Sequence, residues 1–144
     1  MLTLALADRI ADRALAAGVE HGFEPLCVVV LDPGAHALVV KRDERSSIGR
    51  VEIATGKANG CLAMGFGGRE LHRRMEAVPQ FFTALSGVLT KGMVPVPGGV
   101  LVRDDAGAII GAVGVSGDTS ANDEVCAVAG ITAVGLTADT GASQ

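Results

Sequence analysis

The feature that most constrains this fold is a short apolar run that leads into a tight turn. Leu26–Leu31 is rich in β-branched residues and apolar on both faces, which predicts a central strand rather than an edge strand. Asp32, Pro33 and Gly34 follow, and they predict a turn because proline presets φ and glycine accepts a positive φ. His36–Lys41 then returns as the second strand of a β-hairpin.

A second hairpin is predicted in the last third of the chain. Asp104, Asp105 and Gly107 turn the chain between apolar runs at Val100–Arg103 and Ala108–Val115. Helical patterns lie before, between and after the two hairpins. This order predicts an α+β fold with an antiparallel β-sheet of two hairpins and flanking helices.

The first helix is expected to begin at Thr3, whose hydroxyl can cap it. Its apolar stripe contains Leu6, Ile10 and Ala14. Gly18 marks the expected C-terminal end of this helix.

A second helix is expected after the first hairpin, with Ser46 or Ser47 as its cap. Four residues form its apolar stripe: Val51, Ala54, Ala58 and Cys61. Gly56 and Gly60 lie inside it, and each costs about 1 kcal/mol relative to alanine. Such glycines predict that another backbone passes close to the helix.

Two further helices complete the pattern. Gly65–Gly68 break the second helix, and the polar segment GRELHRRMEA predicts a short solvated helix before Pro79. The last helix is expected from Ser120 to about Leu136.

Length and charge exclude several classes of protein. The 144 residues are 49% apolar and 19% charged, which predicts a single globular domain over residues 1–144. A net charge of −4, with scattered Lys and Arg, argues against a nucleic-acid partner. No apolar run approaches the roughly 18 residues that cross a bilayer, and the N-terminal segment is too charged for a signal peptide. We therefore expect a cytoplasmic protein without a membrane partner.

The cysteines and histidines predict no metal site. Cys27, Cys61 and Cys126 lie far apart in apolar segments, where buried reduced thiols are expected. No CxxC, HxxxH or HxH spacing is present, so local ligand pairs for a metal are absent from the sequence.

The stretch from Gly111 to Gly130 has the most concentrated motif of the chain, GAVGVSGDTSANDEVCAVAG. Gly111, Gly114 and Gly117 have GxxGxxG spacing instead of the GxGxxG of dinucleotide-binding folds. A dinucleotide fold also needs a second parallel strand after the helix, for which the chain has no pattern. This motif therefore favours a strand that runs into a capped helix.

The acid pair Asp123 and Glu124 follows that strand and has two interpretations. With Ser120 as the cap, Asp123 occupies the acid position of a capping box, and both acids favour the positive end of the helix dipole. Alternatively, one carboxylate points into a cavity beneath Gly117 and acts as a proton acceptor or ligand.

Two other features permit binding. Pro97, Gly98 and Gly99 can expose successive backbone N–H groups to an anion, or they can simply turn the chain into the sheet. His36 is either a structural hydrogen-bonding residue or a ligand.

The segment Val94–Gly130 resembles the pattern of the GlcG/HbpS family, the haem-degrading or DUF336 domain. That pattern is PGGxP, a strand, GxIGVSG, then DE and a small-residue helix. VVVLDPGAHALVVKRD resembles the family's first hairpin, and Ile53–Ala63 matches its IAxxKAxTA helix, so the resemblance covers nearly the whole chain.

The resemblance implies a profilin-like or Roadblock-like domain that assembles into homo-oligomers, from dimers to octamers. Some members bind haem, which makes haem the implied cofactor here. Related domains accompany corrinoid enzymes or catabolic operons, including one for a hydroxylaminobenzoate lyase, so the family alone leaves the activity open.

The resemblance also carries site residues onto this chain. His36 matches the hairpin histidine, and Arg42 and Asp43 match the ends of the family's RMD motif. Lys57 matches the helix lysine, and the remaining matches to the PGG and DE motifs are Gly98, Gly99, Asp123 and Glu124. With Gly117, these residues form one candidate pocket.

Three functions follow from this pocket. The first is an oligomeric protein that binds a small ligand, with haem held by His36 as the leading case. The second is a cofactor-independent lyase or isomerase acting on a small aromatic or oxo-acid substrate in a catabolic pathway. There Lys57 or Arg42 would hold a carboxylate, and His36, Asp123 or Glu124 would move protons. The third is an assembly subunit without chemistry.

Overall fold

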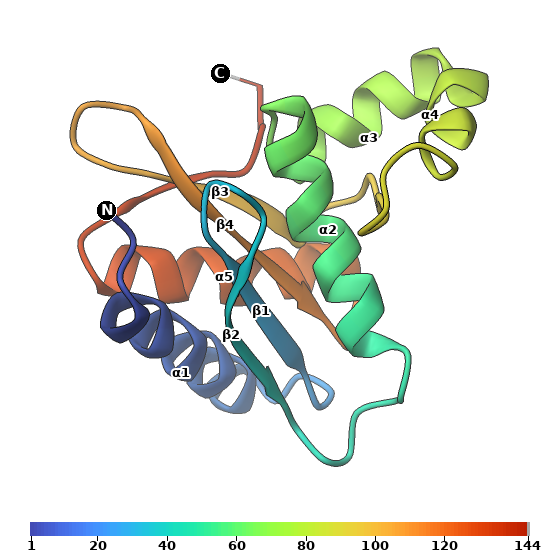
Figure 1. The fold of residues 1–144 in the computed structure, drawn as a ribbon. Coiled ribbons are helices and arrows are strands. Elements are labelled where there is room, and N and C mark those ends of the chain that lie inside the picture. The colour runs from blue at the N-terminus through green and yellow to red at the C-terminus, as the bar shows by residue number, and fades with distance from the viewer. Residues whose placement is uncertain (144) are drawn as a thin grey trace.

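The computed structural model describes residues 1–143 as five helices and one five-stranded sheet (Figure 1). The helices are α1 Leu4–His21, α2 Arg50–Met64, α3 Gly68–Ala77, α4 Pro79–Leu85 and α5 Ser120–Ala133. The strands are β1 Cys27–Leu31, β2 Ala37–Arg42, β3 Gly99–Arg103, β4 Ile109–Ser116 and β5 Thr137–Asp139.

The sheet confirms the predicted antiparallel α+β class. Its strand order is β2-β1-β4-β3-β5, and every neighbouring pair is antiparallel. The apolar run at β1 is central, as predicted, because β2 and β4 flank it. The two hairpins meet through β1 and β4, where Cys27 lies opposite Ser116 and Leu31 lies opposite Ala112.

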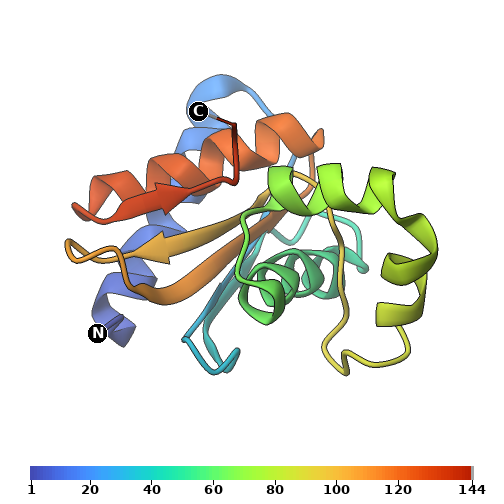
Figure 2. The same ribbon diagram turned by 90° about the horizontal axis from the view of Figure 1, so that it is seen from above.

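Helices cover both faces of the sheet (Figure 2). On one face α1 and α5 pack on alternate strand residues, which include Val28, Val30, Val113 and Val115. On the other face α2 packs on Cys27, Val29, Leu31, Leu101 and Ala112. A strand that is apolar on both faces is therefore required at the centre, which explains the composition of β1.

The ends of α1 confirm one prediction and correct another. The Thr3 hydroxyl accepts a hydrogen bond from the Leu6 N–H at 3.1 Å, so the expected cap is confirmed. The predicted stop at Gly18 is wrong, because the helix continues to His21 and ends at Gly22 in the left-handed conformation. Gly18 instead makes room for a neighbour, since a Cβ there would lie 2.6 Å from Leu26 Cδ1.

The start of α2 also differs from the prediction. Neither Ser46 nor Ser47 caps it; the N-cap is Gly49, which makes no side-chain cap bond. The predicted close approach of another backbone is confirmed at Gly56, whose carbonyl accepts a hydrogen bond from the Val94 N–H at 3.1 Å. At Gly60 the neighbour is a side chain instead, because an added Cβ would lie 2.5 Å from Met93 Sδ.

The sequence pattern missed two short elements. The first is helix α4, which has Pro79 as its first residue. The second is strand β5, whose three residues extend the sheet by pairing with β3. The last helix ends at Ala133 instead of near Leu136, because the chain then turns to form β5.

The three cysteines are buried free thiols, as predicted. Within residues 1–143, no helix combines the length and the apolarity that crossing a membrane requires.

Candidate functional site

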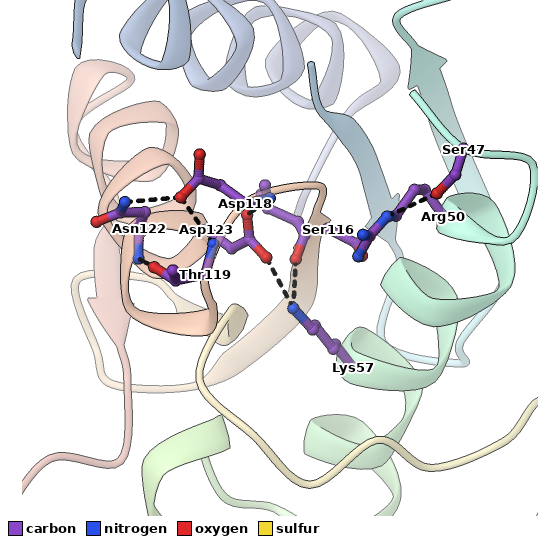
Figure 3. A network of polar contacts seen from close by, with 9 residues as sticks. Ser47, Arg50, Lys57, Ser116, Asp118, Thr119, Asn122 and Asp123 are labelled. Carbon is purple, nitrogen blue, oxygen red and sulfur yellow. Dashed lines mark hydrogen bonds and ion pairs between the residues drawn. The ribbon is translucent and has the colours of Figure 1, made fainter. Parts of the chain in front are cut away.

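A buried ion pair joins Lys57 of α2 to Asp123 of α5 beside the end of β4 (Figure 3). Lys57 Nζ lies 3.0 Å from Asp123 Oδ2 and also donates to the Val115 carbonyl at 2.9 Å. The two side chains are only 4% and 1% exposed, respectively. Charges removed from water to this degree persist only when they are paired and hydrogen-bonded, so each group here depends on the other.

Local sequence explains how these side chains reach each other. Ala54 and Ala58 leave little bulk on the sheet side of α2, and Lys57 shares that buried part of the helix. After Ser116 the chain leaves β4 and enters α5 through a cap at Thr119, whose hydroxyl accepts a hydrogen bond from the Asn122 N–H at 3.2 Å.

The cap at Thr119 corrects the capping-box interpretation of Asp123. The cap is one residue earlier than Ser120, which moves Asp123 past the reciprocal acid position. Its Oδ1 instead accepts the Asp118 N–H at 2.9 Å, while Oδ2 pairs with Lys57. Asp123 therefore links the strand–helix turn to α2.

Burial lowers the pKa of the Lys57 ammonium below its usual value of 10.5. Desolvation is the main cause, and the nearby Arg50 cation lowers the pKa further. Asp123 opposes both effects by charge and by its hydrogen bond. The structure thus holds an amine beside a carboxylate in a weakly hydrated environment, an arrangement that occurs both in structural ion pairs and in proton-transfer sites.

The predicted glycine segment lies directly over this ion pair. Gly98 has φ 108°, and a Cβ there would lie 2.9 Å from Lys57 Nζ and 3.2 Å from Asp123 Cβ. Gly99 begins β3, and its Cβ would lie 2.5 Å from the Lys57 carbonyl oxygen. Both positions need glycine because the chain passes in contact with α2.

Gly117 and Glu124 contact segments of the chain other than Lys57 and Asp123. A Cβ at Gly117 would lie 2.3 Å from the Pro25 carbonyl oxygen, so this glycine packs against the segment that leads into β1. Glu124 accepts two hydrogen bonds from Arg69 Nε, at 3.0 and 2.9 Å, and this pair ties α5 to α3.

Arg42 and Asp43 form a loop at the end of β2. Arg42 Nη1 donates to the Asp43 and Ser46 carbonyl oxygens at 3.2 and 3.1 Å. Asp43 pairs with Arg45, whose hydrogen bonds lower the pKa of that carboxyl to about 2. Both residues line a cavity of about 360 Å³ whose apolar side includes Leu15, Val19, Phe23 and Leu26.

His36 lies at the opposite end of the sheet. The β1–β2 turn that carries it follows Leu31, whereas Ser116 and the buried ion pair adjoin the Cys27 end of β1. The His36 side chain is 76% exposed, with Nδ1 3.3 Å from the Asp32 carboxylate. The prediction that one pocket gathers His36 with Lys57 and Asp123 is therefore wrong within a single chain.

The structure adds residues that the sequence did not single out. Ser116 is fully buried and its hydroxyl accepts a hydrogen bond from Arg50 Nη1 at 3.1 Å. Arg50 precedes Lys57 by seven positions, a spacing that puts both on one side of a helix. That spacing from Lys57 is the sequence signal that could have identified Arg50 as a neighbour of the ion pair. In residues 1–143, no group of three His, Cys, Asp or Glu side chains is arranged to hold a metal ion.

Comparison with known proteins decides the family. A family profile described as haem degrading protein HbpS-like matches residues 2–132. The chain belongs to this HbpS-like family. The fold and family implied by the sequence motifs are thus confirmed.

Solved structures agree with this HbpS-like fold. A crystal structure of a PduOC–haem complex superimposes with a TM-score of 0.83 at 23% identity, covering 94% of this chain and 96% of that one. A crystal structure of HbpS gives a TM-score of 0.79 at 26% identity, covering 92% and 89%. Protein ORFY of Klebsiella pneumoniae, of family DUF336, gives 0.79 at 22% identity, covering 92% and 90%. No curated protein sequence gave a significant match.

Proposed function

We propose that this HbpS-like protein binds haem and that His36 supplies a ligand to the iron. The observation that carries the proposal is the match of residues 2–132 to a family of haem-degrading proteins. The PduOC domain of the same fold was crystallised with haem, although at 23% identity that likeness speaks for the fold alone.

The surroundings of His36 fit a haem ligand. Its imidazole is exposed, and Nδ1 faces the Asp32 carboxylate, a contact that orients the ring and leaves Nε2 as the free acceptor. The Gly34 and His36 N–H groups hold that carboxylate at 2.9 Å, and these hydrogen bonds lower the pKa of Asp32. Asp32 therefore stays ionised and keeps the ring oriented. Haem bound here would supply iron-centred ligand binding and redox chemistry.

The walls of a haem site do not surround His36 within one chain. The imidazole is 76% exposed, so little of the chain covers it. We therefore include a homo-oligomer in the proposal, in which a second copy covers the exposed hairpin. Native mass spectrometry with and without haemin tests this part: a strict monomer in both conditions would contradict it.

Haemin titration of the purified protein tests the iron ligand. The wild-type protein should shift the Soret band, and the His36→Ala variant should lose that shift. His72→Ala is the matched control, because His72 also pairs with an acid four residues away, on an exposed helix. A Soret shift that survives in His36→Ala and disappears in His21→Ala would assign the iron ligand to His21, whose ring stacks on Phe23, instead.

A second function, a cofactor-independent lyase or isomerase for small aromatic or oxo-acids, is favoured by the buried ion pair. Lys57 and Asp123 have the lowered amine pKa and the short contact that proton transfer requires. The segment around Gly98 covers Lys57 and Asp123, and it would have to move away to admit a substrate. Turnover of candidate acids by wild type but not by Lys57→Met or Asp123→Asn would support this function, whereas equal turnover would exclude these residues.

A further inference from the structure

Arg50 has no carboxylate partner in the part of the molecule that the structure describes, and two serine hydroxyls hold its guanidinium instead. Its Nε donates to the Ser47 hydroxyl at 3.0 Å and its Nη1 to the Ser116 hydroxyl at 3.1 Å (Figure 3). Arg50 is half-buried, and its remaining nitrogen, Nη2, has no acceptor among residues 1–143.

The head groups of Arg50 and Lys57 converge on consecutive residues of β4. Arg50 reaches the side chain of Ser116, and Lys57 reaches the carbonyl oxygen of Val115. Two cations thus meet at this strand end, and Asp123 pairs with Lys57. The neighbouring Asp118 carboxylate accepts hydrogen bonds from Glu24, Thr119 and Asn122 and pairs with neither cation. Arg50 therefore keeps a positive charge without a carboxylate partner, and it reaches the fully buried Ser116 on its sheet side.

Two hydroxyls fix the guanidinium without neutralising it. Ser116 is fully buried and Ser47 is exposed, so one serine holds the Arg50 guanidinium from the protein interior and the other from the solvent side. A planar guanidinium fixed in this way can offer its free N–H groups to both oxygens of a carboxylate.

We infer that Arg50, held by Ser47 and Ser116, is the binding site for the carboxylate of a small organic acid. The ligand class is a monocarboxylate, because Arg50, unlike Lys57, is held by hydroxyls and has no carboxylate partner. This site lies at the Cys27 end of the sheet, away from His36, and is thus separate from the haem ligand proposed above. Haem propionates are also carboxylates and could bind Arg50 in the same way. The experiments below therefore distinguish a free organic acid from a haem propionate.

Benzoate is the probe for the small-acid source. Calorimetric titration should show that wild type binds benzoate and that Arg50→Gln binds it about tenfold to a hundredfold more weakly, the loss expected for a charge-assisted hydrogen bond. Arg50→Lys should lie between them, because it keeps the charge and loses the fork. Arg9→Gln, which removes the same charge from the exposed side of α1, should bind as wild type does.

An NMR signal tests the site directly and does not depend on the stability of a variant. The Arg50 Nε–H resonance, assigned by its absence in Arg50→Lys, should move during benzoate titration of the wild-type protein. A second experiment compares the binding of haemin, which has free propionates, with that of its dimethyl ester, which has none. A preference for haemin over the ester that Arg50→Gln abolishes would identify the anion as a propionate.

The inference fails if Arg50→Gln binds both benzoate and haemin as tightly as wild type while the Arg50 signal stays unmoved. That outcome leaves the His36 proposal standing, since the Soret shift of the haemin complex is read independently. Loss of the Soret shift in His36→Ala with intact benzoate binding would support both proposals.

Discussion

Lys57 and Asp123 are 66 positions apart in the chain, and their charged groups meet at 3.0 Å in a place almost closed to water. The pair fastens α2, on one face of the sheet, to the start of α5, which packs on the other face. It therefore ties the two helical layers together at one end of the sheet.

Breaking this pair should be costly from either side. Lys57→Met or Asp123→Asn should each lower the free energy of unfolding by about 3 kcal/mol, because each leaves a buried charge without its partner. The double variant should lose less than the sum of the two. Urea denaturation of all four proteins measures this coupling, and additive losses would show that the two charges do not interact.

The pairing of Asp43 with Arg45 predicts a pH dependence at the acid end. The folded-state pKa of Asp43, about 2, lies below its usual 3.8, so its contribution to stability is complete above about 3.8 and is lost as pH falls through about 2. Arg45→Gln should return the Asp43 titration, followed by carbon NMR of the carboxyl, towards 3.8. An unchanged midpoint in that variant would contradict the assigned cause.

Gly114 predicts a sharp steric effect. A Cβ there would lie 1.9 Å from the Ala54 carbonyl oxygen in α2, so Gly114→Ala should push the helix from the sheet and cost about 3 kcal/mol or more, as severe overpacking does. Gly87→Ala is the control, because its nearest added contact is an ordinary 3.7 Å. Thermal denaturation compares them; equal melting temperatures would show that α2 moves freely.

The three thiols should be unreactive in the folded protein. Burial raises the pKa of Cys27 to about 11, that of Cys61 to about 12 and that of Cys126 to about 11, so little thiolate exists at pH 8. A disulfide reagent such as DTNB should modify none of them until guanidinium unfolds the protein. Rapid modification of any one in native buffer would contradict its burial.

The fold could be predicted from the sequence because its main signals are local. Strand β1 is apolar on both faces, and Gly56 and Gly60 show that another segment crosses α2. The caps were less predictable, since Thr119 and Ser120 are adjacent and equally able to accept the hydrogen bond. Strand β5 has three residues and no apolar pattern of its own, so only its partner β3 defines it.

The site was only partly predictable, because its contacts join distant segments. Family motifs pointed to Lys57, Asp123 and Gly98, and the structure does bring these together. The same motifs added His36, which the strand register carries to the other end of the sheet. Arg50 lies outside those motifs, and its partner Ser116 is far from it in the sequence.

The sheet order also bears on how the chain reaches this state. Each hairpin is local and can form early, whereas the seam between β1 and β4 joins the first third of the chain to the last. During synthesis the edge of β1 that pairs with β4 therefore stays unpaired until β4 has emerged from the ribosome. An apolar strand with an unpaired edge is prone to aggregation, so this interval is the stage of synthesis at which the chain is most exposed to it.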